Sequence, residues 1–194
     1  MIKYKCLNWE ERELAIWNNF WGYIQISYHR LFWVFLFGCI VYWLVHRTSS
    51  KGAKKDIIFR AIFSMACSFV FVMTLFNRHV SDYAVTIKPF WSYYTAYKMN
   101  DAELWLQIIM NIAMYIPIGF SMPECFSFMQ KFWKILLVTV VCSGMIEIIQ
   151  YILNIGYPDV DDTLNNVIGG MIGYGIYALY KKYLEKKYTK ENGK

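Results

Sequence analysis

The sequence predicts an all-α fold, a polytopic membrane helix bundle of about five transmembrane helices preceded by an N-terminal interfacial helix. Hydrophobic residues make up 57% of the 194-residue chain. Charged residues make up only 18%, whereas a soluble domain usually carries about a quarter. The hydrophobic residues lie in long blocks, and the basic residues lie beside these blocks. This pattern is typical of a protein whose solvent is the bilayer.

The first 26 residues differ from the rest of the chain. Between residues 8 and 25, large apolar side chains alternate with charged and amide side chains. A helix that lies in the membrane interface has this composition, with one face in the lipid and the other in water. A cap packed over the bundle would carry the same pattern. We therefore define residues 1–26 as an amphipathic, interfacial segment and leave its packing open.

Five blocks are long and apolar enough to cross the membrane as helices, which takes about 20 residues. They cover residues 28–46, 57–76, 103–122, 132–153 and 163–181. Polar residues and glycines dilute the third and fifth blocks. Together the blocks define a transmembrane domain at residues 27–181, which is followed by a basic tail at residues 182–194.

The basic residues predict the orientation of the chain. Lysine and arginine gather at residues 47–55, at residues 131–134 and in the C-terminal tail, whereas residues 154–162 contain none. Basic loops remain in the cytoplasm, so the tail is predicted to be cytoplasmic. The N-terminus and the loops at 77–102 and 154–162 are then predicted to lie outside. The net charge of +6 therefore indicates topology rather than a nucleic-acid partner.

One carboxylate interrupts the fourth block. Glu147 lies about two turns from its outer end, and Gln150 and Tyr151 follow at i+3 and i+4, on the same helical face. A carboxylate at the centre of a span costs about 2.5–3.5 kcal/mol on insertion scales. An ionisable residue in a membrane helix therefore indicates a functional site by default.

The third and fifth blocks also carry polar faces. Asn111 and Tyr115 are four residues apart in the third block, and Asn166 begins a stripe with Gly169 and Gly173 in the fifth. Polar groups that face lipid would go unsatisfied, so the three faces are predicted to meet inside the bundle, towards the outer leaflet. Interhelical hydrogen bonding and close glycine packing are alternative explanations.

Three aspartates precede the fifth block. Asp159, Asp161 and Asp162 lie within four residues of one another. Either Asp161 or Asp162 is expected to be the N-cap of the fifth helix. Capping accounts for one aspartate but not for three beside a membrane glutamate.

Four segments together resemble a known family. "NIAMYIPIGF" resembles the N-x-x-x-F-x-P-x-G-F segment of the VanZ-like membrane family, and "EIIQ" resembles its E-x-x-Q. "DVDDTLNNVIGGMIGY" resembles its D-x-x-D-x-x-x-N-x-x-G followed by Gly-Tyr, and "TIKPFWSYY" resembles its N-L-x-P-F segment. The four lie in the family's order, between about residues 75 and 178. Departures are Gly156, where many members have arginine, Thr86 in place of asparagine, and Tyr115 in place of phenylalanine.

The resemblance implies a protein of the bacterial plasma membrane that acts near the cell wall. The family is similar to the accessory protein linked with low-level teicoplanin resistance. The resemblance and the polar faces together predict an outward-facing cavity that binds an amphiphile. The amphiphile is either a lipid-linked cell-wall precursor or a lipoglycopeptide, and membrane lipids surround the protein. The cavity is predicted to be lined by Pro89, Phe90, Asn111, Tyr115, Glu147, Gln150, Asp159, Asp162 and Asn166.

Two other classes of function remain open. In an enzyme acting on a lipid or a lipid-linked substrate, Glu147, Asp159 and Asp162 are the predicted ligands of a divalent cation, or Glu147 is a general acid or base. No other cofactor is expected. In a scaffold protein, the polar faces would only hold the helices together.

Overall fold

The computed structural model describes residues 28–48, 54–75 and 85–192, so the predicted interfacial segment at 1–26 lies outside the described residues. The described residues are mostly helical and contain no strand, only an isolated bridge between Thr86 and Asp159, which confirms the all-α prediction. Its helices are α2 (Tyr28–Thr48), α3 (Lys54–Leu75), α4 (Trp91–Met99), α5 (Ala102–Cys125), the short 3-10 helix η1 (Ser127–Met129), α6 (Phe132–Leu153) and α7 (Val160–Asn192).

Four of the described helices are long and apolar enough to cross a membrane. These spans are Arg30–Arg47 in α2, Ile57–Leu75 in α3, Ala102–Cys125 in α5 and Phe132–Leu153 in α6. They correspond to the first four predicted spans. The fifth, 163–181, is helical within α7 but does not reach the same hydropathy, because asparagines, glycines and tyrosines dilute it. A membrane-crossing α7 therefore stays a prediction.

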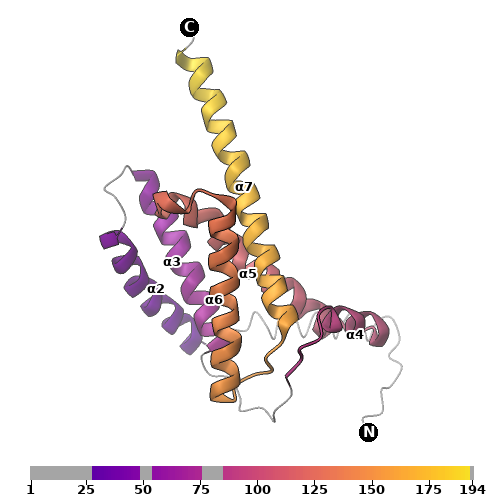
Figure 1. Ribbon diagram of the computed structural model, residues 1–194. Coiled ribbons are helices and arrows are strands. Elements are labelled where there is room, and N and C mark those ends of the chain that lie inside the picture. Colours follow the sequence, from indigo (N-terminus) through magenta and orange to yellow (C-terminus); the bar gives the residue numbers. More distant parts are fainter. Residues whose placement is uncertain (1–27, 49–53, 76–84, 193–194) are drawn as a thin grey trace.

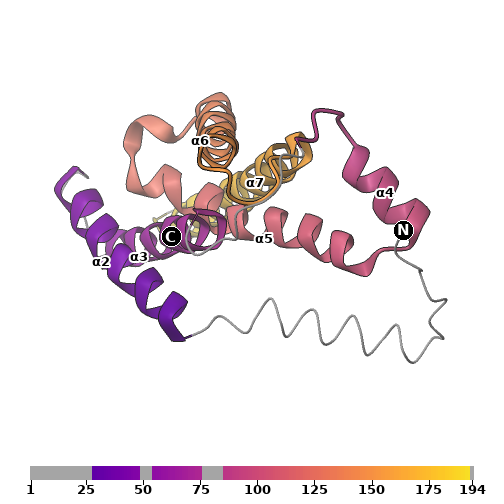
Figure 2. The ribbon, with the colours of Figure 1, turned by 90° about the horizontal axis from the view of Figure 1, so that it is seen from below.

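The helices pack around α5, which contacts α3, α4 and α7. In Figures 1 and 2, α2 lies at one edge of the bundle and α4 at the opposite edge. The C-terminal part of α7 extends beyond the other helices in Figure 1. The end of α6 and the start of α7 lie at the same end of the bundle as α4.

Glycines set the distance between α5 and α7. A Cβ atom on Gly169 would lie 2.0 Å from the carbonyl oxygen of Ile112, and one on Gly173 would lie 2.1 Å from that of Ile116. The two backbones can therefore touch only because these side chains are absent, as the sequence predicted. This contact brings the first turns of α7 against the part of α5 that carries Asn111.

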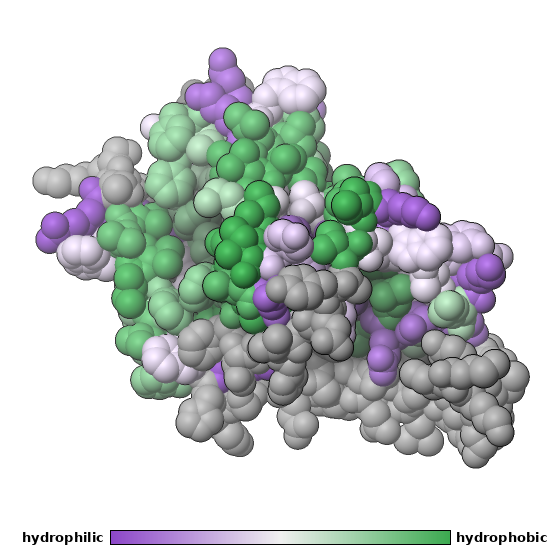
Figure 3. All heavy atoms as spheres, turned by 60° about the horizontal axis from the view of Figure 1, so that its bottom comes forward, coloured by the Kyte–Doolittle hydropathy of each residue, from purple (hydrophilic) through white to green (hydrophobic). Residues whose placement is uncertain are grey.

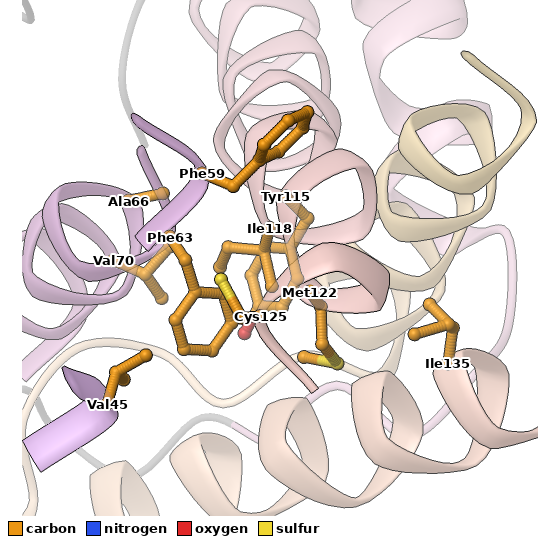
Figure 4. Close-up of a cluster of buried hydrophobic side chains, with 10 residues drawn as sticks. All are labelled: Val45, Phe59, Phe63, Ala66, Val70, Tyr115, Ile118, Met122, Cys125 and Ile135. Carbon is orange, nitrogen blue, oxygen red and sulfur yellow. The ribbon is translucent and has the colours of Figure 1, made fainter. Parts of the chain in front are cut away.

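A hydrophobic cluster packs α2, α3, α5 and α6 together. Figure 4 shows its members: Val45, Phe59, Phe63, Ala66, Val70, Tyr115, Ile118, Met122, Cys125 and Ile135. Phe63 of α3 is directed at Ile118 and Cys125 of α5. Tyr115, which the sequence placed in the polar cavity, lies in this cluster with 3% of its surface exposed.

Candidate functional site

Most of the polar residues singled out from the sequence meet at the N-terminal end of α7. We call this cluster the polar junction. It comprises Asp159, Asp161, Asp162 and Asn165, together with their partners Phe90, Ser92, Tyr93, Gln107, Asn111 and Glu147. The partners come from α6, from α5 and from the start of α4, so the junction joins four separate parts of the chain.

The loop between α6 and α7 turns sharply so that its end reaches the start of α4. Asn154 ends α6 in the left-handed conformation (φ 54°), and buried Gly156 has φ 71°, a conformation that favours glycine. The loop then pairs with Thr86, whose N–H donates to the Pro158 carbonyl (3.0 Å) and whose carbonyl accepts the Val160 N–H (3.1 Å). The two segments that flank the junction are thereby held side by side.

Asp161 caps a helix other than its own. Its Oδ1 accepts the backbone N–H of Phe90 at 2.6 Å, and its Oδ2 accepts that of Ser92 at 2.8 Å. The carboxylate is fully buried and lies at the positive end of the α4 dipole. Phe90 has φ 63°, which is unusual for an aromatic residue, and the bond to Asp161 holds its backbone in place.

Asp159, rather than Asp161 or Asp162, is the N-cap of α7. Its Oδ1 accepts the N–H of Asp161 at 2.9 Å, which corrects the prediction from the sequence. The reason is that α7 begins at Val160, so both later aspartates lie in its first turn. The other oxygen, Oδ2, accepts the Ser92 hydroxyl at 2.5 Å.

The environment of Asp159 favours its neutral form. Burial raises the pKa of its carboxyl above the ordinary value, and the neighbouring Asp161 carboxylate adds to the rise. The hydrogen bonds from the Ser92 hydroxyl and the Asp161 N–H lower the pKa and offset part of this effect. Asp159 is therefore a carboxyl group of the junction whose protonation responds to burial.

Glu147 holds the loop against α6. Its Oε2 accepts the backbone N–H of Asp159 at 2.9 Å, and its side chain is half-buried. The glutamate that seemed costly in a span is therefore in direct contact with Asp159, the N-cap of α7.

Asp162 faces α5. Asn111 donates its Nδ2 to Oδ1 at 2.6 Å, and Gln107 donates its Nε2 to Oδ2 at 3.3 Å. The sequence identified Asn111 and Asp162 but not Gln107. The spacing could have identified Gln107, because it lies four residues before Asn111 and therefore on the same helical face.

Asn165 joins α7 to α4. Its Oδ1 accepts the hydroxyl of Tyr93, while its Nδ2 is buried without a hydrogen-bond partner. The whole residue has no exposed surface. Burial raises the pKa of Tyr93, with a further contribution from Asp161, so the phenol remains a donor.

Asn166 points to α6. Its Nδ2 donates to the Ser143 hydroxyl at 2.7 Å, and its Oδ1 is buried without a partner. The sequence did not identify Ser143, although it lies one turn before Glu147. The two asparagines therefore leave one donor and one acceptor unused in a buried region.

Besides Asn166, three predicted cavity residues lie outside the polar junction. Gln150 is buried and donates its Nε2 to the Thr74 carbonyl at 2.9 Å, so it fastens α6 to α3. Tyr115 lies in the hydrophobic cluster. Pro89 is exposed at the turn before α4, next to Phe90, whose side chain is 65% exposed.

The carboxylates of the junction face different ways. Within residues 28–48, 54–75 and 85–192, no group of three or more His, Cys, Asp and Glu side chains is arranged to hold a metal ion. The hydrogen bonds explain this, since Asp161 faces α4, Asp162 faces α5, and Glu147 contacts a backbone N–H. The arrangement binds amide and hydroxyl donors.

Comparisons with known proteins agree with this description. A family model described as VanZ/LLP1 matches residues 61–181, which is more than half of the chain. Protein VanZ from Enterococcus faecium is 29% identical over 119 residues, and the match covers 60% of this chain and 65% of that protein. No solved structure matches. The match to the family model extends from α3 into α7 and includes the polar junction from Phe90 to Asn165, so this chain belongs to the VanZ/LLP1 family.

Proposed function

We propose that this protein binds an amphiphile at the polar junction and thereby contributes to low-level resistance to teicoplanin. The amphiphile is a lipid-linked cell-wall precursor or the lipoglycopeptide itself, and it enters a polar cavity that opens outside the bacterial plasma membrane. Family membership supports the connection with the cell wall. The four candidate spans support the location in a membrane.

One observation carries the proposal. The Nδ2 of Asn165 and the Oδ1 of Asn166 are buried without partners, although buried polar groups are nearly always hydrogen-bonded. A ligand that carries amide or hydroxyl groups would satisfy both. Asn165 is also linked to the surface, because Tyr93, which donates to it, lies 6.2 Å from the exposed ring of Phe90.

The surroundings of the junction fit an amphiphile better than a small polar ligand. Large side chains near it are exposed, namely Phe90, Trp91, Tyr94 and Tyr157. Aromatic side chains bury apolar bodies while the polar ends of tyrosine and tryptophan stay wet. The polar junction would then orient the head of the ligand, while these exposed aromatic side chains hold its tail.

The charges support an outward-facing junction. Lys131, Lys134 and the lysines from Lys181 to Lys190 lie at the end of the bundle opposite to α4 and the start of α7. The positive-inside rule assigns the lysine-rich end to the cytoplasm. The C-terminus is then cytoplasmic, the N-terminus lies outside, and the junction faces the cell wall.

Drug susceptibility tests the proposal. The chain is expressed in a susceptible Gram-positive host, and minimal inhibitory concentrations are measured for teicoplanin, which has a lipid tail, and vancomycin, which has none. We expect the value to rise for teicoplanin only and to return to the vector level with Asn165→Leu. The control is Asn100→Gly, because Asn100 is exposed and has φ 50°, which glycine adopts readily. An equal rise for both drugs would contradict recognition of the tail, and no rise would contradict the function.

A second candidate, an intramembrane enzyme that acts on a lipid-linked substrate, is favoured by the raised pKa of Asp159. Carboxyl groups whose pKa is raised are typical of acid–base sites, and the backbone N–H of Asp159 contacts the Glu147 carboxylate. The metal-dependent form would require the carboxylates of Glu147, Asp159 and Asp162, which face different ways, to turn towards one divalent cation. Calorimetric titration of the purified protein with Mg²⁺, Mn²⁺ and Zn²⁺ tests that form, and absence of saturable binding would contradict it.

A further inference from the structure

We propose that the exposed face of α4 is a docking surface for anionic phospholipid headgroups of the bilayer that surrounds the protein. The surface comprises Lys88, Trp91, Tyr94, Tyr97 and Lys98. This inference concerns bulk membrane lipid rather than the amphiphile of the polar junction. The surface shares Trp91 and Tyr94 with the aromatic side chains around that junction, but it adds two lysines and does not depend on binding of the amphiphile.

The helix α4 has one buried side and one exposed side. Ser92 and Ala96, four residues apart, are buried with 8% and 0% exposure. Trp91, Tyr94 and Tyr97, which are spaced by three, are 44%, 51% and 82% exposed. A spacing of three to four residues places each set on one helical face. The buried face packs on the bundle, and the exposed face is aromatic.

The exposed face suits the membrane interface. With nine residues, α4 is about 14 Å long, too short to cross a hydrocarbon core of about 30 Å. It lies at the edge of the bundle, beside helices that are long enough to cross (Figure 1). Tryptophan and tyrosine are enriched at the level of the headgroups, where their rings meet lipid and their polar atoms meet water.

Two lysines give the face its charge. The Nζ of Lys88 lies 5.2 Å from the centroid of the Trp91 ring, and the Nζ of Lys98 lies 5.4 Å from that of Tyr94. Both ammonium groups are therefore placed on the aromatic face. In Figure 3, white and purple spheres gather on the right, where α4 lies, and green dominates to the left. The nearby Asp101 uses its carboxylate to accept the N–H groups of Glu103 and Leu104.

The position of the face is set at both ends of α4. Asp161 binds the N–H groups at the start, and Asp101 donates its N–H to the Ala96 carbonyl at 3.0 Å at the end. Each lysine beside an anionic membrane surface contributes about 1 kcal/mol of attraction. Lys88, in the turn before α4, and Lys98, in the last turn of α4, therefore favour negatively charged lipid over zwitterionic lipid.

A local probe tests the inference. Tyr97→Cys is introduced into a variant of the 194-residue chain in which the five cysteines are replaced by alanine. This protein is labelled with an environment-sensitive fluorophore and placed in nanodiscs. The discs contain phosphatidylcholine alone or with phosphatidylglycerol, plus a lipid with a nitroxide on its headgroup. We expect stronger quenching with phosphatidylglycerol, and loss of this difference in Lys88→Gln/Lys98→Gln or at high salt.

The matched control is Lys131→Gln/Lys134→Gln. Lys134 lies 6.0 Å from the Phe128 ring, which repeats the cation–aromatic arrangement at the other end of the bundle. This pair should leave the quenching at position 97 unchanged. The inference would be overturned if quenching were the same with and without phosphatidylglycerol, and the same in Lys88→Gln/Lys98→Gln as in the control variant. It would also be overturned by quenching that rises with a polyprenyl pyrophosphate but not with phosphatidylglycerol, since that outcome assigns the face to a lipid-linked precursor.

A second measurement covers the case in which the cysteine-free protein does not fold. Native mass spectrometry of the unlabelled protein counts the phosphatidylglycerol molecules that are retained on release from the detergent micelle. We expect fewer on Lys88→Gln/Lys98→Gln than on the control pair. Equal retention would overturn the inference. Neither experiment uses teicoplanin, so failure of the lipid-docking inference is distinguishable from failure of the proposed function.

Discussion

The carboxylate of Asp161, in the first turn of α7, accepts the backbone N–H of Phe90 at 2.6 Å, although the two residues are 71 positions apart. A second oxygen of the same carboxylate accepts the N–H of Ser92. One buried side chain therefore fixes the start of α4 relative to α7. The aromatic face of α4 depends on this link for its position.

Asp161→Ala should destabilise the protein. Two N–H groups that are satisfied in the wild type would lose their acceptor, and each buried, unpaired group costs about 1–3 kcal/mol. We expect a lower midpoint of thermal unfolding in detergent, measured by circular dichroism. Glu185→Ala, at an exposed position near the end of α7, is the control and should leave the midpoint nearly unchanged. Equal midpoints for both variants would show that α4 is held by other contacts.

The contact between α5 and α7 can be tested with two glycines of the same helix. In Gly169→Ala, the new Cβ would lie 2.0 Å from the Ile112 carbonyl oxygen, so the helices must separate, at a cost of about 1–3 kcal/mol. In Gly175→Ala, the new Cβ meets nothing within 4 Å, and the helix gains about 0.5–1 kcal/mol. Thermal unfolding should therefore move in opposite directions. A shift of the same sign in both variants would contradict the close packing.

Glu147→Gln should remove resistance without removing the fold. Glutamine keeps an oxygen that can accept the Asp159 N–H, so the loop stays attached while the negative charge is lost. We expect the teicoplanin inhibitory concentration to fall to the vector level, with unchanged amounts of protein in the membrane fraction. Tyr151→Phe, on the same helix at a side chain that is 53% exposed, is the control. Retained resistance in Glu147→Gln would favour the scaffold function.

Asp159 predicts a specific pH dependence of stability. Because burial raises its folded-state pKa above the ordinary value near 3.8, the folded protein binds this proton more tightly than the unfolded chain does. The contribution of Asp159 to stability is therefore most favourable below about 3.8 and is lost as pH rises through the folded pKa. Relative to Asp159→Asn, the wild type should gain stability as pH falls through this window.

The measurement is the difference in unfolding midpoint between wild type and Asp159→Asn across acidic pH. Taking the difference cancels the titration of the other carboxyl groups, provided they are unaffected by the substitution. A difference that is constant with pH, or that favours the wild type more as pH rises, would contradict the raised pKa.

Hydropathy and motif spacing predicted much of this protein. The apolar blocks became α2, α3, α5 and α6, because a long apolar run is helical in lipid whatever surrounds it. The stripe of Gly169 and Gly173 predicted close packing, since a missing side chain is visible in the sequence itself. Hydropathy predicts a membrane crossing less strongly for the fifth block, because the polar residues of this block lower its mean hydropathy.

The sequence by itself determined that the chain is a bundle of membrane helices and that its polar groups had to turn inward, because these properties follow from local composition and from the cost of polar groups in lipid. Only the tertiary structure decided which groups meet. Asp159 became the cap of α7, Asp161 bound α4, and Gln150 went to α3. Partners of this kind depend on the rotation and separation of neighbouring helices, which are set by contacts between residues far apart in the chain.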